Sequence, residues 1–103
     1  MDKYPQNALQ EKTPSFKYNE GHTLDELFNY IKKTYGSHYG DRTSAVDLID
    51  AAGHAEGFYI GNIIKYATRY GKKNGHNKDD LMKVLHYAVL AVDHHNKHHE
   101  KDK

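Results

Sequence analysis

The chain has 103 residues, of which 37% are hydrophobic, and a formal net charge of +1. This balance argues against general nucleic-acid binding, which usually needs a strong basic excess. There is no cysteine, which excludes disulfides and thiolate metal sites. The length fits one small domain, and because so thin an apolar core is marginal alone, we expect a homo-oligomer.

The domain organisation follows from composition along the chain. Residues 1–20 are polar and lack an apolar period, which is typical of a flexible N-terminal arm. Residues 21–97 carry helical periodicity and are expected to form the domain, and residues 98–103 form a polar tail. Without a transmembrane-length apolar stretch or an apolar signal region, we expect a cytoplasmic protein with no membrane partner.

Capping signals predict the first two helices. The first should begin at Thr23, with Glu26 as its capping-box partner, and stop near Gly36. The second should begin at Ser44, with Asp47 in the same role. Their expected buried residues are Leu24, Leu27, Phe28, Ile31, Val46, Leu48, Ile49 and Ala52.

Two further helices complete an all-α fold, a small bundle of about four helices. The third should span residues 57–73, with a basic end that runs into a connection at residues 71–77, where Gly71 and Gly75 give mobility. The fourth should begin at Asn77 with Asp80 three positions later. Their expected apolar rows are Ile60, Ile63, Ile64 and Ala67 on the third and Leu81, Val84, Leu85, Ala88 and Val92 on the fourth. The fourth is apolar on a second side as well, which we interpret as a subunit contact.

The polar face of the third helix is the main candidate for binding. Its residues are Gly61, Asn62, Lys65, Arg69 and Lys72, and no acidic residue lies between Gly57 and Asn77. Lys65 and Arg69, one turn apart, can converge on a phosphate group. Gly61 lets a flat ligand approach the backbone, and Asn62 suits a base edge or a sugar. A solvated basic face without a ligand is the alternative, and it is common.

Other candidates lie in the loop before the second helix and within that helix. His38 and Tyr39 are loop residues beside helix ends, and His38 could contact a phosphate or move a proton. Asp47 and Asp50 share one face and could hold Mg²⁺, although capping already explains Asp47.

The polar end of the chain is rich in histidine. If the fourth helix continues, His94 and His98 lie one turn apart, as do His95 and His99. Such pairs can bind Zn²⁺, Ni²⁺ or Cu²⁺, but two ligands on one exposed helix need a third. A solvated, frayed tail is the alternative.

Two segments of the chain resemble the signature of the SaV-like family, small phage-encoded proteins that form a domain of unknown function. The segments are Gly61-Asn62-Ile63-Ile64-Lys65-Tyr66-Ala67-Thr68-Arg69-Tyr70-Gly71-Lys72-Lys73 and Asp79-Asp80-Leu81-Met82-Lys83-Val84-Leu85-His86-Tyr87. The family pattern is roughly G-N-x-x-K-Y-x-x-R, a basic residue, then D-L-x-K-A-x-x-Y. It is preceded by a His-Tyr pair, matched here by His38-Tyr39, and by a short helix, matched by residues 45–52. The similarity covers about residues 37 to 97.

The resemblance implies nucleotide handling, because this family includes a phage nucleotide kinase that lacks a P-loop. The present chain also has no Walker sequence. The residues expected to bind ligand are His38, Tyr39, Gly61, Asn62, Lys65, Tyr66, Arg69, Lys72, Lys73, Lys83 and Tyr87. The candidates for catalysis are His38, Asp50 and Asp80, with Mg²⁺ as the cofactor of a nucleoside-monophosphate kinase. The compartment would then be the host cytoplasm.

Two other functions stay open. The first is a non-catalytic protein that sequesters a nucleotide or a cyclic-nucleotide signal with the same residues. The second is a helical protein-interaction module whose contact surface is the fourth helix. A kinase needs two nucleotide sites, and one basic face accounts for only one. An unambiguous general base or metal cluster would decide for the enzyme, and the sequence does not supply it.

Overall fold

The computed structural model describes residues 16–35 and 44–100. Within these residues the protein is all-helical, as predicted, with four α-helices and no strand. The helices are α2 (Glu20–Thr34), α3 (Ala45–Ala51), α4 (Ala55–Arg69) and α5 (Lys78–His98). None of the four combines the length and the apolar character that a bilayer crossing requires.

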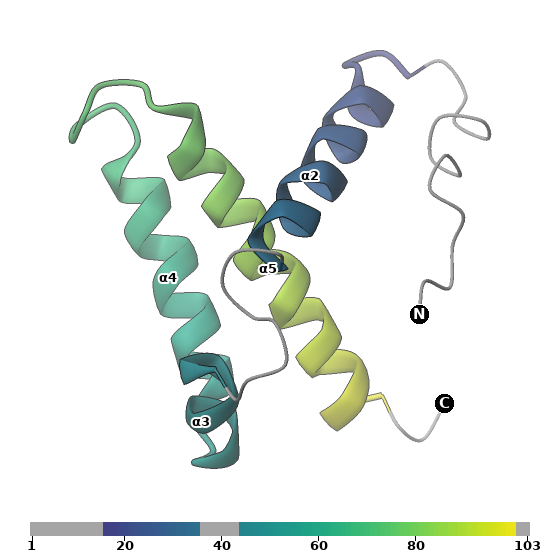
Figure 1. Cartoon of the computed structure of the whole chain (residues 1–103), viewed down its shortest axis with the longest axis vertical. Helices are drawn as coiled ribbons and strands as arrows, with labels where there is room; N and C mark the ends of the chain where they lie inside the picture. The colour runs from purple at the N-terminus through teal and green to yellow at the C-terminus, as the bar shows by residue number, and fades with distance from the viewer. Residues whose placement is uncertain (1–15, 36–43, 101–103) are drawn as a thin grey trace.

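The centre of the fold is an antiparallel hairpin of α4 and α5, which share the most extensive helix contact (Figure 1). The α2 helix packs across α5, where Lys78 forms an ion pair with Glu26 of α2. The short α3 packs on α4. The two helices of the hairpin therefore each carry one further helix, α3 on α4 and α2 on α5.

The turn between α4 and α5 ends α4 earlier than the sequence indicates. We predicted a helix as far as residue 73, whereas α4 ends at Arg69. Gly71 and Gly75 both have positive φ (86° and 66°), and the Gly71 N–H donates to the Gly75 carbonyl at 2.9 Å. A Cβ on Gly71 would lie 3.2 Å from the His76 ring, so glycine is needed there for both conformation and space. Lys72 and Lys73 consequently lie in the turn.

The predicted caps of α3 and α5 are confirmed. The Asp47 N–H donates to the Ser44 hydroxyl (3.2 Å), and the Ser44 N–H donates to the Asp47 carboxylate (3.0 Å). The Asn77 side chain accepts from the Asp79 N–H (2.9 Å) at the start of α5. Both caps satisfy backbone donors that the first helical turn leaves without a partner.

The predicted start of α2 is wrong by one turn. The helix begins at Glu20, after Asn19 in the left-handed conformation (φ 63°). The Asn19 carbonyl accepts the Thr23 N–H (3.1 Å), and the Glu20 carboxylate accepts the Tyr18 N–H (2.9 Å). Asparagine tolerates the left-handed conformation, so the chain turns into the helix before the Thr23 signal is reached.

The buried face of α4 is not the predicted isoleucine row. Ile60 and Ile64 are 46% and 60% exposed, and the most buried large residue of α4 is Tyr59. Aromatic rings bury more area than isoleucine, and α4 accordingly turns its tyrosines toward α5. The buried residues of the described structure are Leu27, Ala55, Tyr59, Asp80, Met82 and His86.

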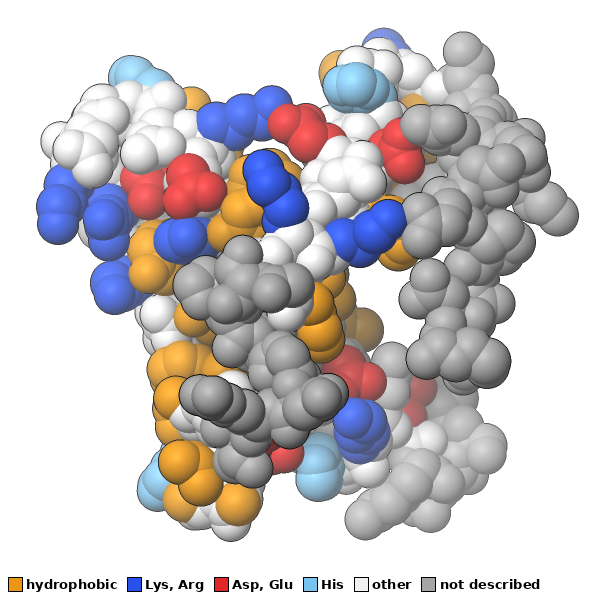
Figure 2. Space-filling view, viewed as in Figure 1, with side chains coloured by type: hydrophobic (Ala, Val, Ile, Leu, Met, Phe, Trp, Pro, Cys, Tyr) orange, Lys and Arg blue, Asp and Glu red, His pale blue; other side chains and the backbone are white. Residues whose placement is uncertain are grey.

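On α5, too, the buried side chains are not those of the predicted apolar row. Leu81 and Val92, at the two ends of the predicted core row, are exposed, whereas Met82 and His86 are buried. Leu48 of α3, which we expected to be buried, is exposed as well. A set of apolar side chains thus stays on the surface of the isolated chain, and Figure 2 shows hydrophobic side chains gathered over α3 and the beginning of α4.

Candidate functional site

Three cationic side chains converge on the ring of Tyr66, near the C-terminal end of α4. The distances to the ring centroid are 4.9 Å for Lys65 Nζ, 5.4 Å for Arg69 Cζ and 5.9 Å for Lys83 Nζ. Lys83 belongs to α5, so the hairpin brings the two segments of the motif together. Figure 2 shows Lys and Arg side chains gathered at this end of the molecule. The electron-rich face of a tyrosine attracts cations and holds them together here.

Aromatic side chains form a wall beside these cations. The rings of Tyr66 and Tyr87 lie almost parallel, at an interplanar angle of 8° with 6.2 Å between centroids. The ring of Phe58 meets Tyr87 edge-on at 5.7 Å. A hollow of about 130 Å³ is lined by Tyr30, Thr34, Tyr66, Lys83, His86, Tyr87 and Leu90. It is smaller than the roughly 300 Å³ at which pockets for drug-sized ligands begin, so it has room for a small group only.

Lys83 connects the hollow to both α2 and its own helix. Its ammonium donates to the Tyr30 hydroxyl (3.3 Å) and pairs with the Asp79 carboxylate (3.1 Å). Burial acts to lower the pKa of Lys83, but the hydrogen bonds to Asp79 and Tyr30 outweigh it, and the pKa is raised. The side chain is therefore a fixed positive charge at neutral pH.

A buried carboxylate lies at the base of the cluster. Asp80 is only 4% exposed, and its Oδ1 atom lies 3.6 Å from Arg69 Nε. Within the described residues, its Oδ2 atom is buried and has no hydrogen-bond partner. A buried carboxylate oxygen without a donor is costly. Asp80 therefore positions Arg69 through one oxygen, while its other oxygen stays buried without a donor.

His86 is a second buried polar residue, and unlike Asp80 it lines the hollow. It is 7% exposed, and its ring meets Tyr30 edge-on at 5.9 Å. Burial lowers the pKa of His86, and the charge of Lys83 lowers it further, so the imidazole is neutral. Its Nε2 atom has no hydrogen-bond partner among residues 16–35 and 44–100. This nitrogen can accept or donate a hydrogen bond to a group in the hollow.

The other predicted ligand residues of the third helix and the turn do not line the hollow. The Asn62 amide donates to the Phe58 carbonyl one turn back (2.9 Å), so it is engaged with its own helix. Gly61 is exposed, with open space where a Cβ would be. Lys72 and Lys73 are exposed in the turn that follows α4.

Of the remaining candidates, His38 and Tyr39 lie outside the described residues. Asp47 is engaged in the cap of α3. Asp50, also on α3, lies near His94 of α5, at the end of the hairpin away from the turn. The structure thus brings Lys65, Tyr66, Arg69, Asp80, Lys83 and Tyr87 together but places Asp50 elsewhere.

Sequence reasoning missed Tyr30 and His86 as site residues. We counted His86 among the apolar residues of its helix, and Tyr30 drew no attention in the first predicted helix. The one usable signal was the spacing of Lys83 and His86, which puts both side chains on one face of α5. The contact with Tyr30 joins residues 53 positions apart and has no local signal.

The fold and the cluster define a small all-α protein with a basic, aromatic site at one end of a helical hairpin. The chain belongs to the family DUF3310, described as a protein of unknown function, whose pattern matches residues 31–89. This match covers more than half of the chain and includes every residue of the cluster except Tyr30. No curated protein and no solved structure matches the chain.

Proposed function

We propose that this protein binds a nucleotide, or a similar phosphate-bearing small molecule, at the cluster around Tyr66. The observation that carries the proposal is the approach of Lys65, Arg69 and Lys83 to one tyrosine ring. Lysine and arginine are the usual partners of phosphate oxygens, and an aromatic face is a platform on which a base can stack. A ligand that carries both groups would use both parts of the cluster.

The charges of the cluster are only partly neutralised by the protein. In the described structure, no carboxylate lies at ion-pair distance from Lys65, whereas Arg69 pairs with Asp80 and Lys83 with Asp79. Asp79 is exposed, so a phosphate can replace it beside Lys83 at little cost. This arrangement leaves Lys65 and Lys83 to receive the phosphate, while Asp80 holds Arg69 in place.

We propose phosphoryl transfer as the leading activity, on the basis of the resemblance to the SaV-like family. Such a reaction depends mainly on positioning and on neutralising charge, which Lys65, Arg69 and Lys83 would supply. Mg²⁺ is bound by one or two carboxylates together with substrate phosphates. Of the two candidate carboxylates, Asp80 lies beside Arg69 of the cluster and Asp50 lies at the other end of the hairpin, so Asp80 is the residue that we propose for this role.

Sequestration of a nucleotide or a cyclic-nucleotide signal is the second candidate, and the size of the hollow favours it. A kinase must hold a donor and an acceptor together, whereas the hollow of about 130 Å³ has room for a small group only. A binding protein needs only the residues already described. Turnover with Mg²⁺ would favour the kinase, and recovery of unchanged ligand would favour the binding protein.

The test of nucleotide binding compares variants of matched charge. Thermal shift and calorimetry against nucleoside mono-, di- and triphosphates and cyclic nucleotides, with and without Mg²⁺, should find a selective ligand. At 100 times its dissociation constant, that ligand should stabilise the wild type by about 2.7 kcal/mol. The double variant Lys65→Ala/Arg69→Ala should bind it at least about 100-fold more weakly, since each lost charged contact is worth roughly tenfold or more.

The control is Lys17→Ala/Lys97→Ala, which removes the same charge from the two ends of the described structure. It should bind as the wild type does, because neither lysine lies at the cluster. Equally weak nucleotide binding in both double variants would mean that the effect comes from net charge alone. A failure of every nucleotide to shift the wild type would overturn the proposal.

We also propose that the chain assembles as a homo-oligomer. The support is a set of large apolar side chains exposed on α3, α4 and α5, namely Leu48, Ile60, Ile64, Val89 and Val92. Burying them yields about 25 cal/mol per Å² of apolar area. Sedimentation equilibrium should give a mass above that of one chain, and Ile60→Lys/Ile64→Lys should be monomeric. A control change at Leu24, exposed on α2, should leave the mass unchanged. A monomeric wild type would contradict the expectation.

A further inference from the structure

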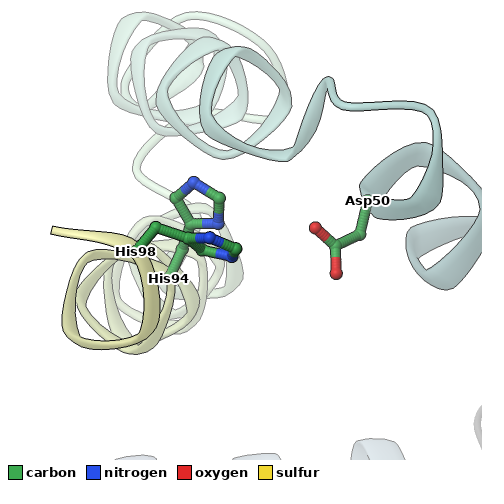
Figure 3. A group of neighbouring side chains, drawn as sticks. All are labelled: Asp50, His94 and His98. Carbon is green, nitrogen blue, oxygen red and sulfur yellow. The ribbon is translucent and has the colours of Figure 1, made fainter. Parts of the chain in front are cut away.

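A second group of polar side chains lies at the opposite end of the hairpin from the nucleotide site. His94 and His98 are one turn apart on α5, and their ring centroids are 4.3 Å apart. Asp50 reaches toward them from α3 (Figure 3). Each of the three residues offers one ligand atom, and these atoms all lie within 4.8 Å of one another. The third ligand that the histidine pair lacked in the sequence is therefore supplied by another helix.

We propose that Asp50, His94 and His98 bind a divalent transition metal, with Zn²⁺ as the first choice. Two imidazoles and one carboxylate form a donor set typical of zinc, which leaves a fourth position for water. Imidazole ligands disfavour Mg²⁺ and Ca²⁺, which prefer oxygen. This site does not depend on the proposed nucleotide site, with which it shares no residue.

The geometry needs little adjustment to receive the ion. A tetrahedral zinc with bonds of about 2.0–2.1 Å separates its ligand atoms by about 3.3 Å. Asp50 and His98 are exposed and can close the remaining distance by side-chain rotation. His94 is more buried and meets the ring of Tyr59 edge-on (6.3 Å), which fixes the central ligand. The nearby cation Lys97 is paired with Asp93 (2.9 Å) and forms no ion pair with Asp50 among the described residues.

A second set of possible metal ligands, the competing set, shares His94 and is the alternative site. Glu56 of α4 and His99, just beyond α5, also place ligand atoms within 4.8 Å of each other and of His94. They border a hollow of about 230 Å³ on the same side of the hairpin. We favour Asp50 and His98, because the His94 ring lies 4.3 Å from His98 but 6.1 Å from His99. In addition, the His99 imidazole lies 3.6 Å from the Glu56 carboxylate, which already gives both groups a partner.

Metal binding would tie together two helices that do not otherwise pack. In the described residues, α3 packs on α4 and has no comparable contact with α5. A zinc ion held by Asp50 and the two histidines would connect α3 directly to the end of α5. Because the unfolded chain does not present these ligands together, zinc should stabilise the folded state.

The experiment is a zinc titration of the full chain, freed of metal, in competition with a chromogenic chelator. The wild type should bind one Zn²⁺ per chain and unfold at a higher temperature with zinc than without it. Asp50→Ala and His98→Ala should each weaken zinc binding by at least about tenfold. Even the loss of a residue that only hydrogen-bonds to a metal ligand typically lowers metal affinity by about 10- to 100-fold. Both positions are exposed, so these variants should keep the helical circular dichroism of the wild type.

The matched control is His95→Ala, the neighbouring histidine on the same helix, which belongs to neither metal-binding set. Zinc affinity close to that of the wild type in this variant would support the assignment. Equal losses in His95→Ala and His98→Ala, or wild-type affinity in Asp50→Ala, would overturn it as adventitious binding by a histidine-rich helix. Loss in Glu56→Ala with retention in Asp50→Ala would also overturn it, in favour of the competing set.

Absorption by Co²⁺ in place of zinc gives a second readout. A tetrahedral site produces intense visible bands, whereas loosely bound cobalt in octahedral water does not. The wild type and His95→Ala should share the intense spectrum, and Asp50→Ala should lose it. Weak bands in the wild type would contradict a tetrahedral site at these residues.

Discussion

Replacing Asp80 with alanine is expected to lower the free energy of unfolding by about 3 kcal/mol, because the change leaves Arg69 beside an empty, poorly solvated space. The carboxylate is 4% exposed and lies 3.6 Å from Arg69 Nε. The Arg69 side chain is 29% exposed and can recover part of its hydration, which puts the cost at the low end of the range for a broken buried pair. Urea denaturation of the two proteins measures the difference directly.

The double variant Arg69→Met/Asp80→Leu separates stability from binding. Replacing a buried ion pair with apolar residues of similar volume is often neutral or stabilising. We therefore expect this variant to recover most of the stability lost in Asp80→Ala but to bind nucleotide weakly, because Arg69 is gone. A loss below about 1 kcal/mol in Asp80→Ala would show that the pair is solvated and has no structural role.

Replacing Tyr59 with alanine is expected to lower the free energy of unfolding by about 3–4 kcal/mol, which is as large as the effect of Asp80→Ala or larger. Tyr59 is 7% exposed and lies between α4 and α5, with the Phe58 ring at 6.0 Å and the His94 ring at 6.3 Å. In a domain of this size each kcal/mol shifts the melting temperature by about 4–8 °C. Differential scanning calorimetry should therefore show a fall of more than about 12 °C.

Tyr59→Phe is the control for that experiment. It keeps the ring and removes only the hydroxyl, so we expect the free energy of unfolding to fall by only about 1 kcal/mol. Similar melting temperatures for the alanine and phenylalanine variants would mean that the ring does not fill the space between the helices. In Tyr59→Ala, His94 also loses its edge contact, so we expect weaker zinc binding as a secondary effect.

The caps of two helices, which depend on contacts between near neighbours in the chain, were predicted correctly from the sequence. The caps at Ser44 and Asn77 involve side chains two or three residues from their partners, and both were confirmed. The start of α2 was missed because Asn19 adopts a left-handed conformation that propensity rules rank low. The connection with Gly71 and Gly75 was predicted at residues 71–77, but the helix was also carried too far, to Lys73, whereas α4 ends at Arg69.

Features that depend on packing between helices could not be read from the sequence. Ile60 and Ile64 have the spacing of a buried face, but α4 turns Tyr59 toward α5 instead. Periodicity identifies an apolar side without identifying the neighbour that covers it, and a helix with two apolar sides leaves that choice open. The homo-oligomer that we propose would cover the side that stays exposed.

The residues of the candidate sites also fall into two groups, those predicted from local spacing and those that depend on packing between helices. Lys65 and Arg69 were predicted together because they lie one turn apart on one helix, and Tyr66 was added from the resemblance to the family motif. The unpartnered oxygen of Asp80 and the neutral ring of His86 follow from burial, which no spacing reports. The approach of Asp50 to the C-terminal histidines joins α3 to α5, and only the folded chain brings these residues together.

The dominant contact of the fold joins two helices that are also neighbours in the chain, and this order has a kinetic consequence. Contacts between sequence neighbours close short loops, and helical proteins rich in such contacts fold in microseconds to milliseconds. The α4–α5 hairpin is therefore expected to form first, with α2 joining α5 across a much longer stretch of chain. Because Tyr30 of α2 forms one side of the aromatic hollow, we expect that hollow to be completed only when α2 docks on α5.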